Sequence, residues 1–119
     1  AIAGAVRFGY GVECDVQISA DGQAMVFHDA MLGRLTHVQG AVADHTAAVL
    51  TRVPIAGTRD TIPTLAEVLE IIGGKVPLLI EIKDQTDAMA ETDGRLEAAT
   101  AAALATYRQC TLNRAWLLH

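Results

Sequence analysis

Positive charge, aromatic side chains and long apolar runs are all scarce in this sequence, and two of these shortages exclude a class of protein. The 119 residues include 9 Lys and Arg against 14 Asp and Glu, which gives a formal net charge of -5. Because no cluster of Lys or Arg occurs, we expect no nucleic-acid partner. No apolar run reaches the roughly 18 residues that a membrane-spanning helix needs, so we expect no transmembrane segment. A cytoplasmic location is a separate expectation.

Cysteine is scarce as well, with two residues in the chain. Cys14 falls on the apolar side of a predicted strand and Cys110 lies far along the sequence. This placement predicts two small buried hydrophobic side chains in preference to a disulfide. What the chain does have is apolar residues, at 51% of the total, which is enough for one domain with a sizeable core.

The most informative stretch is Val12–Ile18, in which apolar and polar residues alternate. This period of two predicts a strand with one packed face and one polar face. Glu13 and Asp15 then project from the same face. Two neighbouring carboxylates repel each other and lose hydration, so the pair predicts a compensating charge. A hard divalent cation, which prefers oxygen ligands, is the simplest one.

A hairpin is predicted next, because Asp21-Gly22 is typical of a two-residue turn of type I′. Directly opposed residues in a hairpin share a face, so the turn is expected to return the His28 imidazole beside the carboxylates. Imidazole is the side chain that most readily exchanges a proton near neutral pH. With this loop the predicted pairs are Ala20 with Gln23, Ile18 with Met25, Val16 with Phe27, and Asp15 with His28.

The rest of the chain alternates helices and strands, an order typical of a parallel α/β fold. The first predicted elements are the end of a helix over residues 1–7 and a helical turn over 44–52. They are followed by a helix over Leu65–Ile72 with a Thr64–Glu67 capping box and by a strand over Val76–Lys83 buried on both faces. A helix over 86–107, which Gly94 could interrupt, and a strand beginning at Ala115 complete the order.

Chemically useful side chains are expected to meet at one end of this sheet. Ligands of such folds bind at the carboxyl ends of the strands, and Glu81 and Lys83 close the buried strand predicted above. Together with Glu13, Asp15 and His28 they suit metal-assisted attack on a phosphate ester. A cation would polarise the phosphoryl oxygens, the lysine would neutralise a further charge, and the histidine would move the proton.

Each of these residues also has a purely structural explanation. From spacing alone, the solvated polar face of an antiparallel strand explains Glu13 and Asp15 equally well. His28 taken alone is better explained as a hydrogen-bonded histidine at a strand end. Lys83 could pair with a neighbouring carboxylate instead of a phosphate.

Several motifs, taken in order, resemble the glycerophosphodiester phosphodiesterase family over about residues 1–83, with looser agreement after that. Any one of them is weak alone, whereas five in register are specific. They are Gly11-Val12-Glu13-Cys14-Asp15-Val16-Gln17-Ile18-Ser19-Ala20-Asp21-Gly22, Val26-Phe27-His28-Asp29, the pattern of Leu32, Arg34 and Thr36, Ile62-Pro63-Thr64-Leu65 with Glu67-Val68-Leu69, and Ile80-Glu81-Ile82-Lys83.

The resemblance implies a TIM-type (β/α) barrel, with residues 1–119 forming about its first half and a β-hairpin excursion after the first strand present. It implies one divalent ion, Mg²⁺ or Ca²⁺, at Glu13, Asp15 and Glu81. His28 would be one of two catalytic histidines, acting as general acid or base, and Lys83 would contact the phosphate. The implied reaction is hydrolysis of a small glycerophosphodiester to glycerol 3-phosphate and an alcohol.

The sequence also departs from the family, which leaves alternatives open. The His-Arg-Gly motif of the family's first strand does not occur in these residues, and neither does the C-terminal half of the domain. An eight-stranded barrel needs about 250 residues. One alternative is therefore a non-catalytic barrel fragment with a structural or regulatory role. Another is a phospholipase D-like or cyclising relative that acts on lysophospholipids.

Overall fold

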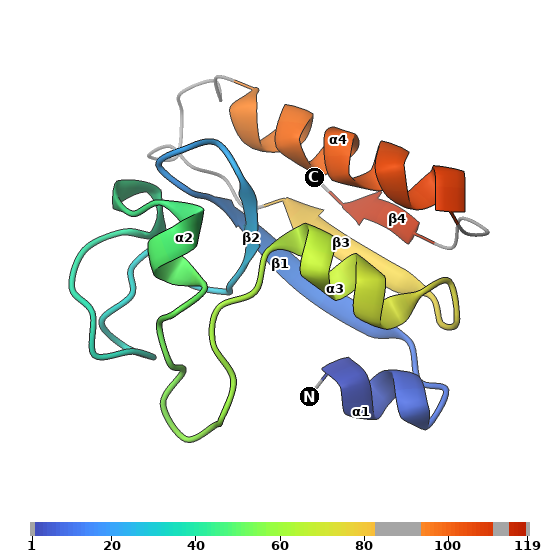
Figure 1. The fold of residues 1–119 in the computed structure, drawn as a ribbon, viewed down its shortest axis with the longest axis horizontal. Coiled ribbons are helices and arrows are strands. Elements are labelled where there is room, and N and C mark those ends of the chain that lie inside the picture. The colour runs from blue at the N-terminus through green and yellow to red at the C-terminus, as the bar shows by residue number, and fades with distance from the viewer. Residues whose placement is uncertain (1, 83–93, 111–114, 119) are drawn as a thin grey trace.

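The protein folds into one mixed sheet with helices packed on it, as a computed structural model shows (Figure 1). The model describes residues 2–82, 94–110 and 115–118. The elements in chain order are α1 (Ile2–Arg7), β1 (Val12–Ile18), β2 (Ala24–Val26), the 3-10 turn η1 (Val42–Asp44), α2 (Ala47–Leu50), α3 (Leu65–Ile72), β3 (Leu78–Ile82), α4 (Arg95–Cys110) and β4 (Ala115–Leu118).

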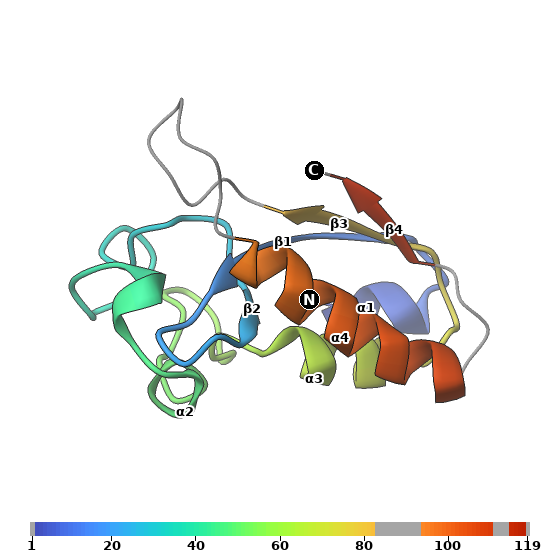
Figure 2. The same cartoon turned by 90° about the horizontal axis from the view of Figure 1, so that it is seen from above.

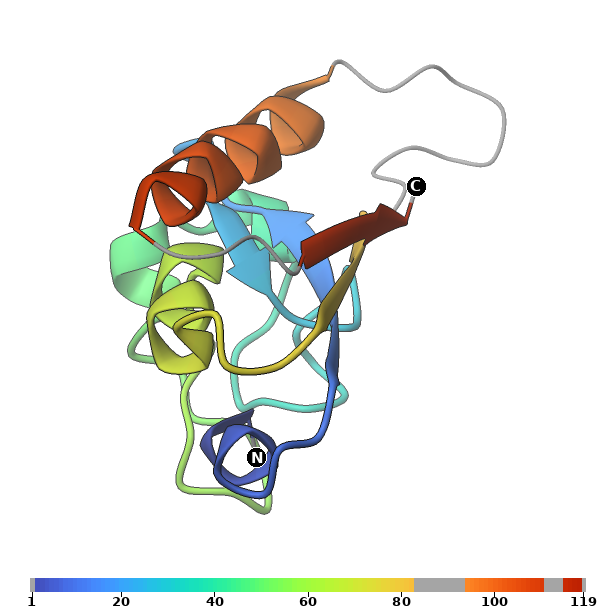
Figure 3. The same ribbon diagram turned by 90° about the vertical axis from the view of Figure 1, so that its right-hand side faces the viewer.

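The sheet has the order β2-β1-β3-β4, in which β1, β3 and β4 are parallel and β2 is antiparallel to β1. Helices α1, α3 and α4 all lie on one face of it (Figures 2 and 3). The prediction that the second parallel strand is buried on both faces is therefore wrong. Leu78 and Ile80 are buried under the helices, whereas Leu79 on the opposite face is 37% exposed.

The larger core fills the space between the sheet and these helices. Helix α3 has the predicted bounds, and its ends explain them. At its start the Thr64 hydroxyl accepts a hydrogen bond from the Glu67 backbone N–H at 3.1 Å. At its end Gly73 adopts a left-handed conformation with φ 52°, which favours glycine. The buried residues of α3 are Leu65, Val68, Leu69 and Ile72.

Helix α4 begins at Arg95, directly after Gly94 with its positive φ of 77°, which is where the sequence allows an interruption of the predicted helix. The part of that prediction over residues 86–93 lies outside the described residues. Leu96, Leu104 and Tyr107 of α4 are buried in the larger core. Among the described helices, none combines the length and the apolar character that crossing a bilayer requires.

The hairpin forms, but its predicted pairing is wrong by one residue. The observed partners are Val16 with Val26, Gln17 with Met25, and Ile18 with Ala24. The loop has three residues, because the Ser19 N–H donates to the Gln23 carbonyl at 2.9 Å. Of the residues in this loop, Gly22 alone has a positive φ, at 82°. A type I′ turn needs two such residues, and Asp21 does not supply the second.

The excursion from residue 27 to residue 62 has its own small core at one end of the sheet. Figure 1 shows that the carboxyl ends of the parallel strands point toward this end. The helical turn predicted over 44–52 is present as η1 and α2. The excursion thus lies beside the end of the sheet toward which the parallel strands run. Its core residues are Met25, Phe27, Leu32, Val42, Leu50, Val53 and Ile62.

Candidate active site

Three carboxylates from two strands meet on the face of the sheet that carries no helix. Glu13, Asp15 and Glu81 each offer an oxygen, and these oxygens lie within 4.8 Å of one another. The register explains the meeting, since Asp15 lies directly opposite Glu81 on the neighbouring strand. Glu13 is exposed and the other two are partly buried. The sequence prediction that these side chains gather at one point is confirmed; their role as ligands stays a prediction.

The position of Glu13 in its strand differs from the expectation. It is the second residue of β1, not a residue near the strand's carboxyl end. The strand is longer than its parallel part, which stops at the pair of Val16 with Ile82. Beyond that pair, β1 continues as an arm of the hairpin with β2. Asp15 and Glu81 therefore lie near the end of the parallel pairing, whereas Glu13 lies near its start.

His28 lies at the same place, although not for the predicted reason. It follows the end of β2 at Val26, so no ladder partner sets its position. It lines a groove of about 290 Å³ together with Glu13 and Asp15. Its imidazole is 64% exposed. The structure thus brings His28 to one groove with Glu13 and Asp15, while the predicted pairing of His28 with Asp15 is wrong.

The fifth predicted residue, Lys83, lies outside the described residues. It directly follows β3, which ends at Ile82. Its contact with a phosphate stays a prediction from the resemblance.

The thiol between the two acidic residues of β1 points to the other face. Cys14 is 6% exposed and belongs to the core under the helices. Burial raises the pKa of the Cys14 thiol to about 12, and the nearby Asp15 and Glu13 carboxylates add to the rise. A thiol in this state is protonated and inert, so Cys14 is a packing residue and not a nucleophile. This agrees with the sequence prediction of a small buried hydrophobic side chain.

Sequence analysis missed the residues that surround His28. Gln17 was assigned only to a polar face, yet it is 2% exposed and its Nε2 donates to the His28 carbonyl at 3.0 Å. Asp29 accepts a hydrogen bond from His28 and two from Arg34. The one signal in the sequence was that Asp29 and Arg34 belong to the motifs of the family resemblance.

Comparison with known proteins decides the family. A sequence model of the Glycerophosphoryl diester phosphodiesterase family matches residues 1–117. The chain belongs to this family. The acidic cluster and His28 are therefore features of a phosphodiesterase-family domain, and the resemblance seen in the sequence motifs is confirmed.

Individual relatives agree with the family assignment. A glycerophosphodiester phosphodiesterase of Caldanaerobacter subterraneus subsp. tengcongensis is 42% identical over 82 residues, which are 61% of this chain and 33% of that protein. A glycerophosphodiester phosphodiesterase of Bacillus altitudinis is 37% identical over 79 residues, 61% of this chain and 32% of the relative. The chain spans about a third of the length of these curated relatives.

A solved structure gives the fold. A putative glycerophosphoryl diester phosphodiesterase from Agrobacterium tumefaciens superposes with a TM-score of 0.82 at 26% identity, covering 98% of this chain and 47% of that one. The prediction of an incomplete (β/α) barrel is thereby confirmed. In this phosphodiesterase-family chain, the open mixed sheet corresponds to a part of the barrel wall.

Proposed function

We propose that the complete protein containing this chain hydrolyses small glycerophosphodiesters to glycerol 3-phosphate and an alcohol, with one divalent cation. The observation that carries the proposal is one groove that is lined by Glu13 and Asp15 of the acidic cluster and by His28, in a chain of this family. A related Oleispira antarctica phosphodiesterase was solved in complex with the product sn-glycerol-3-phosphate. It is 28% identical with a TM-score of 0.76, over 98% of this chain and 47% of that one.

The acidic cluster fits a hard cation in its chemistry and its dimensions. Two oxygens on one ion are separated by at most twice the metal–oxygen distance, about 5 Å for Ca²⁺ and about 4 Å for Mg²⁺. The observed spread of up to 4.8 Å suits Ca²⁺ directly. For Mg²⁺ small side-chain rotations suffice, and exposed Glu13 has room for one. A cation would also offset the repulsion between the carboxylates, which solvent already reduces at exposed Glu13.

The roles of the residues follow from their chemistry. Glu13, Asp15 and Glu81 would hold the ion, and Lys83 would contact the phosphate as the family resemblance implies. A bound divalent cation would withdraw charge from the phosphoryl oxygens. His28 would move a proton to or from the substrate. Among the described residues that line the groove it is the only imidazole, so a second proton transfer would use a group from elsewhere in the protein.

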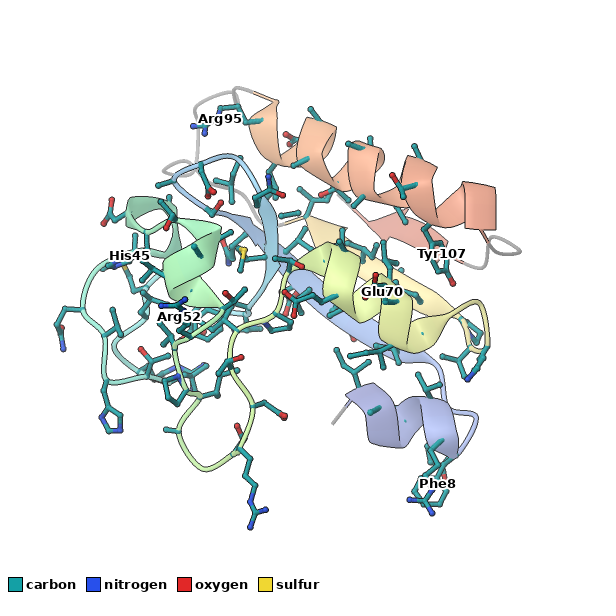
Figure 4. All side chains as sticks on the ribbon, in the orientation of Figure 1. Phe8, His45, Arg52, Glu70, Arg95 and Tyr107 are labelled. Atoms are coloured by element: carbon teal, nitrogen blue, oxygen red, sulfur yellow. The ribbon has the colours of Figure 1, made fainter. Side chains whose placement is uncertain are left out.

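The test is an assay of the complete protein after chelation and dialysis. Release of glycerol 3-phosphate from glycerophosphocholine is measured with no added ion, with Mg²⁺ and with Ca²⁺. We expect turnover only with an ion present. Glu13→Gln should lower turnover by more than the roughly 10- to 100-fold that loss of an outer-shell partner costs. Glu70→Gln removes the same charge from the exposed surface of α3 and serves as the matched control (Figure 4).

Two results would overturn the proposal. One is absence of hydrolysis with either ion in a protein that circular dichroism shows to be folded. The other is equal turnover by Glu13→Gln and Glu70→Gln. Formation of a cyclic phosphate, or hydrolysis of a lysophospholipid in place of glycerophosphocholine, would instead assign the protein to the phospholipase D-like alternative.

A further inference from the structure

Asp29 lies between two cationic or protonatable side chains and accepts hydrogen bonds from both. Its Oδ1 is 2.8 Å from His28 Nδ1 and 2.9 Å from Arg34 Nη2, and its Oδ2 accepts from Arg34 Nε at 2.7 Å. The guanidinium therefore binds the carboxylate through both oxygens, which fixes the carboxylate plane. Asp29 is 19% exposed, against 64% for His28 and 65% for Arg34.

This arrangement determines where the proton of the imidazole lies. The Arg34 guanidinium, with a smaller contribution from His28, holds the pKa of the Asp29 carboxyl well below its usual range. Asp29 is thus an acceptor only, and the hydrogen shared with His28 belongs to Nδ1. In the neutral imidazole Nε2 is then unprotonated, so it is the nitrogen that can take up a proton.

The backbone on both sides of this contact is also held. Gln17, buried in β1, donates to the His28 carbonyl. On the other side of Arg34, the Thr36 hydroxyl and its backbone N–H both donate to the carbonyl of Leu32, at 2.9 and 3.0 Å. Leu32 is fully buried in the small core of the excursion. Arg34 therefore extends from an ordered turn, so the backbone that carries its exposed guanidinium is held in place.

We propose that Asp29 and Arg34 are positioning residues for the hydrolysis, with Arg34 orienting the Asp29 carboxylate and Asp29 fixing the tautomer and direction of His28. The inference rests on the proposed function, because it assigns His28 the proton transfer. Neither residue need contact the substrate. The contact between Asp29 and Arg34 orients side chains and adds little to the stability of the fold, since an exposed ion pair contributes only about 0–1 kcal/mol to folding.

The experiment compares Arg34→Ala, Arg34→Lys and Asp29→Asn with Arg52→Ala in the complete protein with Mg²⁺ and glycerophosphocholine. Arg52 follows α2 on the excursion and is exposed (Figure 4). We expect kcat to fall about 10- to 100-fold in Arg34→Ala and Asp29→Asn, as for other residues that orient a reacting group. KM and the midpoint of thermal unfolding should change little. Arg34→Lys should recover part of the loss, because one ammonium cannot make both hydrogen bonds.

Chemical rescue separates positioning from a general structural effect. Guanidinium ion, added below denaturing concentrations, should raise kcat of Arg34→Ala severalfold. It should leave the double variant Arg34→Ala with Asp29→Asn unchanged, because no carboxylate remains to bind it. The double variant should also be no slower than the slower single variant, since the residues act as one unit.

The outcomes distinguish failure of this inference from failure of the proposed function. If the wild-type protein shows no metal-dependent hydrolysis, the proposed function is wrong and the inference falls with it. If the wild-type protein is active and the Arg34 and Asp29 variants match Arg52→Ala in kcat, the inference alone is wrong. A loss of activity that follows a loss of thermal stability, without guanidinium rescue, would likewise overturn it.

Discussion

Asp15 and Glu81 are directly opposed on two neighbouring parallel strands, so their carboxylates leave the sheet from the same face. Glu13, two residues before Asp15, brings a third carboxylate to this face, within 4.8 Å of the others. Like charges this close repel each other, and a bound cation would offset the repulsion. The stability of the protein should therefore increase when a divalent ion is added, and substitution of one of these carboxylates should remove this dependence.

Glu13→Gln should stabilise the metal-free protein and make it insensitive to metal. Removing one charge relieves the repulsion between the carboxylates. Each kcal/mol added to the free energy of unfolding raises the unfolding midpoint by about 2–4 °C in a domain of 150–250 residues, and a complete barrel has about 250. The wild-type protein, in contrast, should gain about 2.7 kcal/mol at an ion concentration 100 times the dissociation constant. Calorimetric melts with chelator and with Mg²⁺ measure both effects. Equal responses to Mg²⁺ in Glu13→Gln and in the control Glu70→Gln would contradict the assignment.

The hairpin should lose stability in acid through Asp21. Its carboxylate accepts hydrogen bonds from the Ser19 hydroxyl at 2.6 Å and from the Ala47 backbone N–H at 2.9 Å, and these bonds hold the Asp21 pKa below its ordinary value of 3.8. A depressed folded-state pKa gives stability that is present above pH 3.8 and lost as the pH falls through the folded-state value. Wild-type protein should thus be more stable than Asp21→Asn at pH 7, and the difference should shrink below pH 3.8. A difference that stays constant from pH 7 to pH 2 in chemical unfolding would refute this reading.

The start of α3 should depend on one hydroxyl. The Thr64 side chain accepts from the Glu67 backbone N–H, and the loss of such a cap costs about 1 kcal/mol. We expect Thr64→Ala to be destabilised by this amount in urea unfolding. Thr64→Ser keeps the hydroxyl and is the control, so equal destabilisation of both variants would show that the methyl group and not the cap is responsible.

Cys14 should resist alkylation in the folded protein. With its pKa raised to about 12 by burial, its thiolate fraction at pH 8 is about 1000-fold below that of an ordinary thiol. Peptide mass spectrometry after treatment with iodoacetamide should find Cys14 unlabelled in native protein and labelled after unfolding. Labelling of folded Cys14 at the rate of free glutathione would show that the β1 core opens readily.

Much of the fold could be predicted because local signals agreed with the packing. The alternation over Val12–Ile18 and the cap and glycine of α3 each set an element with the observed bounds. The hairpin register could not be predicted. It depends on whether Asp21 adopts a positive φ, and the Ser19 hydroxyl instead stabilises the three-residue loop by accepting from the Gln23 N–H at 2.9 Å.

The candidate site was predictable to a similar degree. The two-residue spacing of Glu13 and Asp15 and the apolar strand that contains Glu81 were enough to find the carboxylates. The parallel register of the two strands then places Asp15 beside Glu81. The contacts around His28 were not predictable from patterns. They depend on a buried polar side chain, Gln17, and on the path of an irregular loop that carries Arg34. Such loops have no periodicity from which partners can be counted.

Because the excursion has a small core of its own, substitutions that change access to the groove need not change the stability of the sheet. Leu32, Leu50 and Ile62 are fully buried in this small core. It is separate from the larger core, whose residues pack under α3 and α4. Substitutions on the outer surface of this loop can therefore alter what enters the groove while the barrel wall keeps its stability. Under the proposed function, head-group preference would then change through substitutions in this one segment, without change to the acidic residues of β1 and β3.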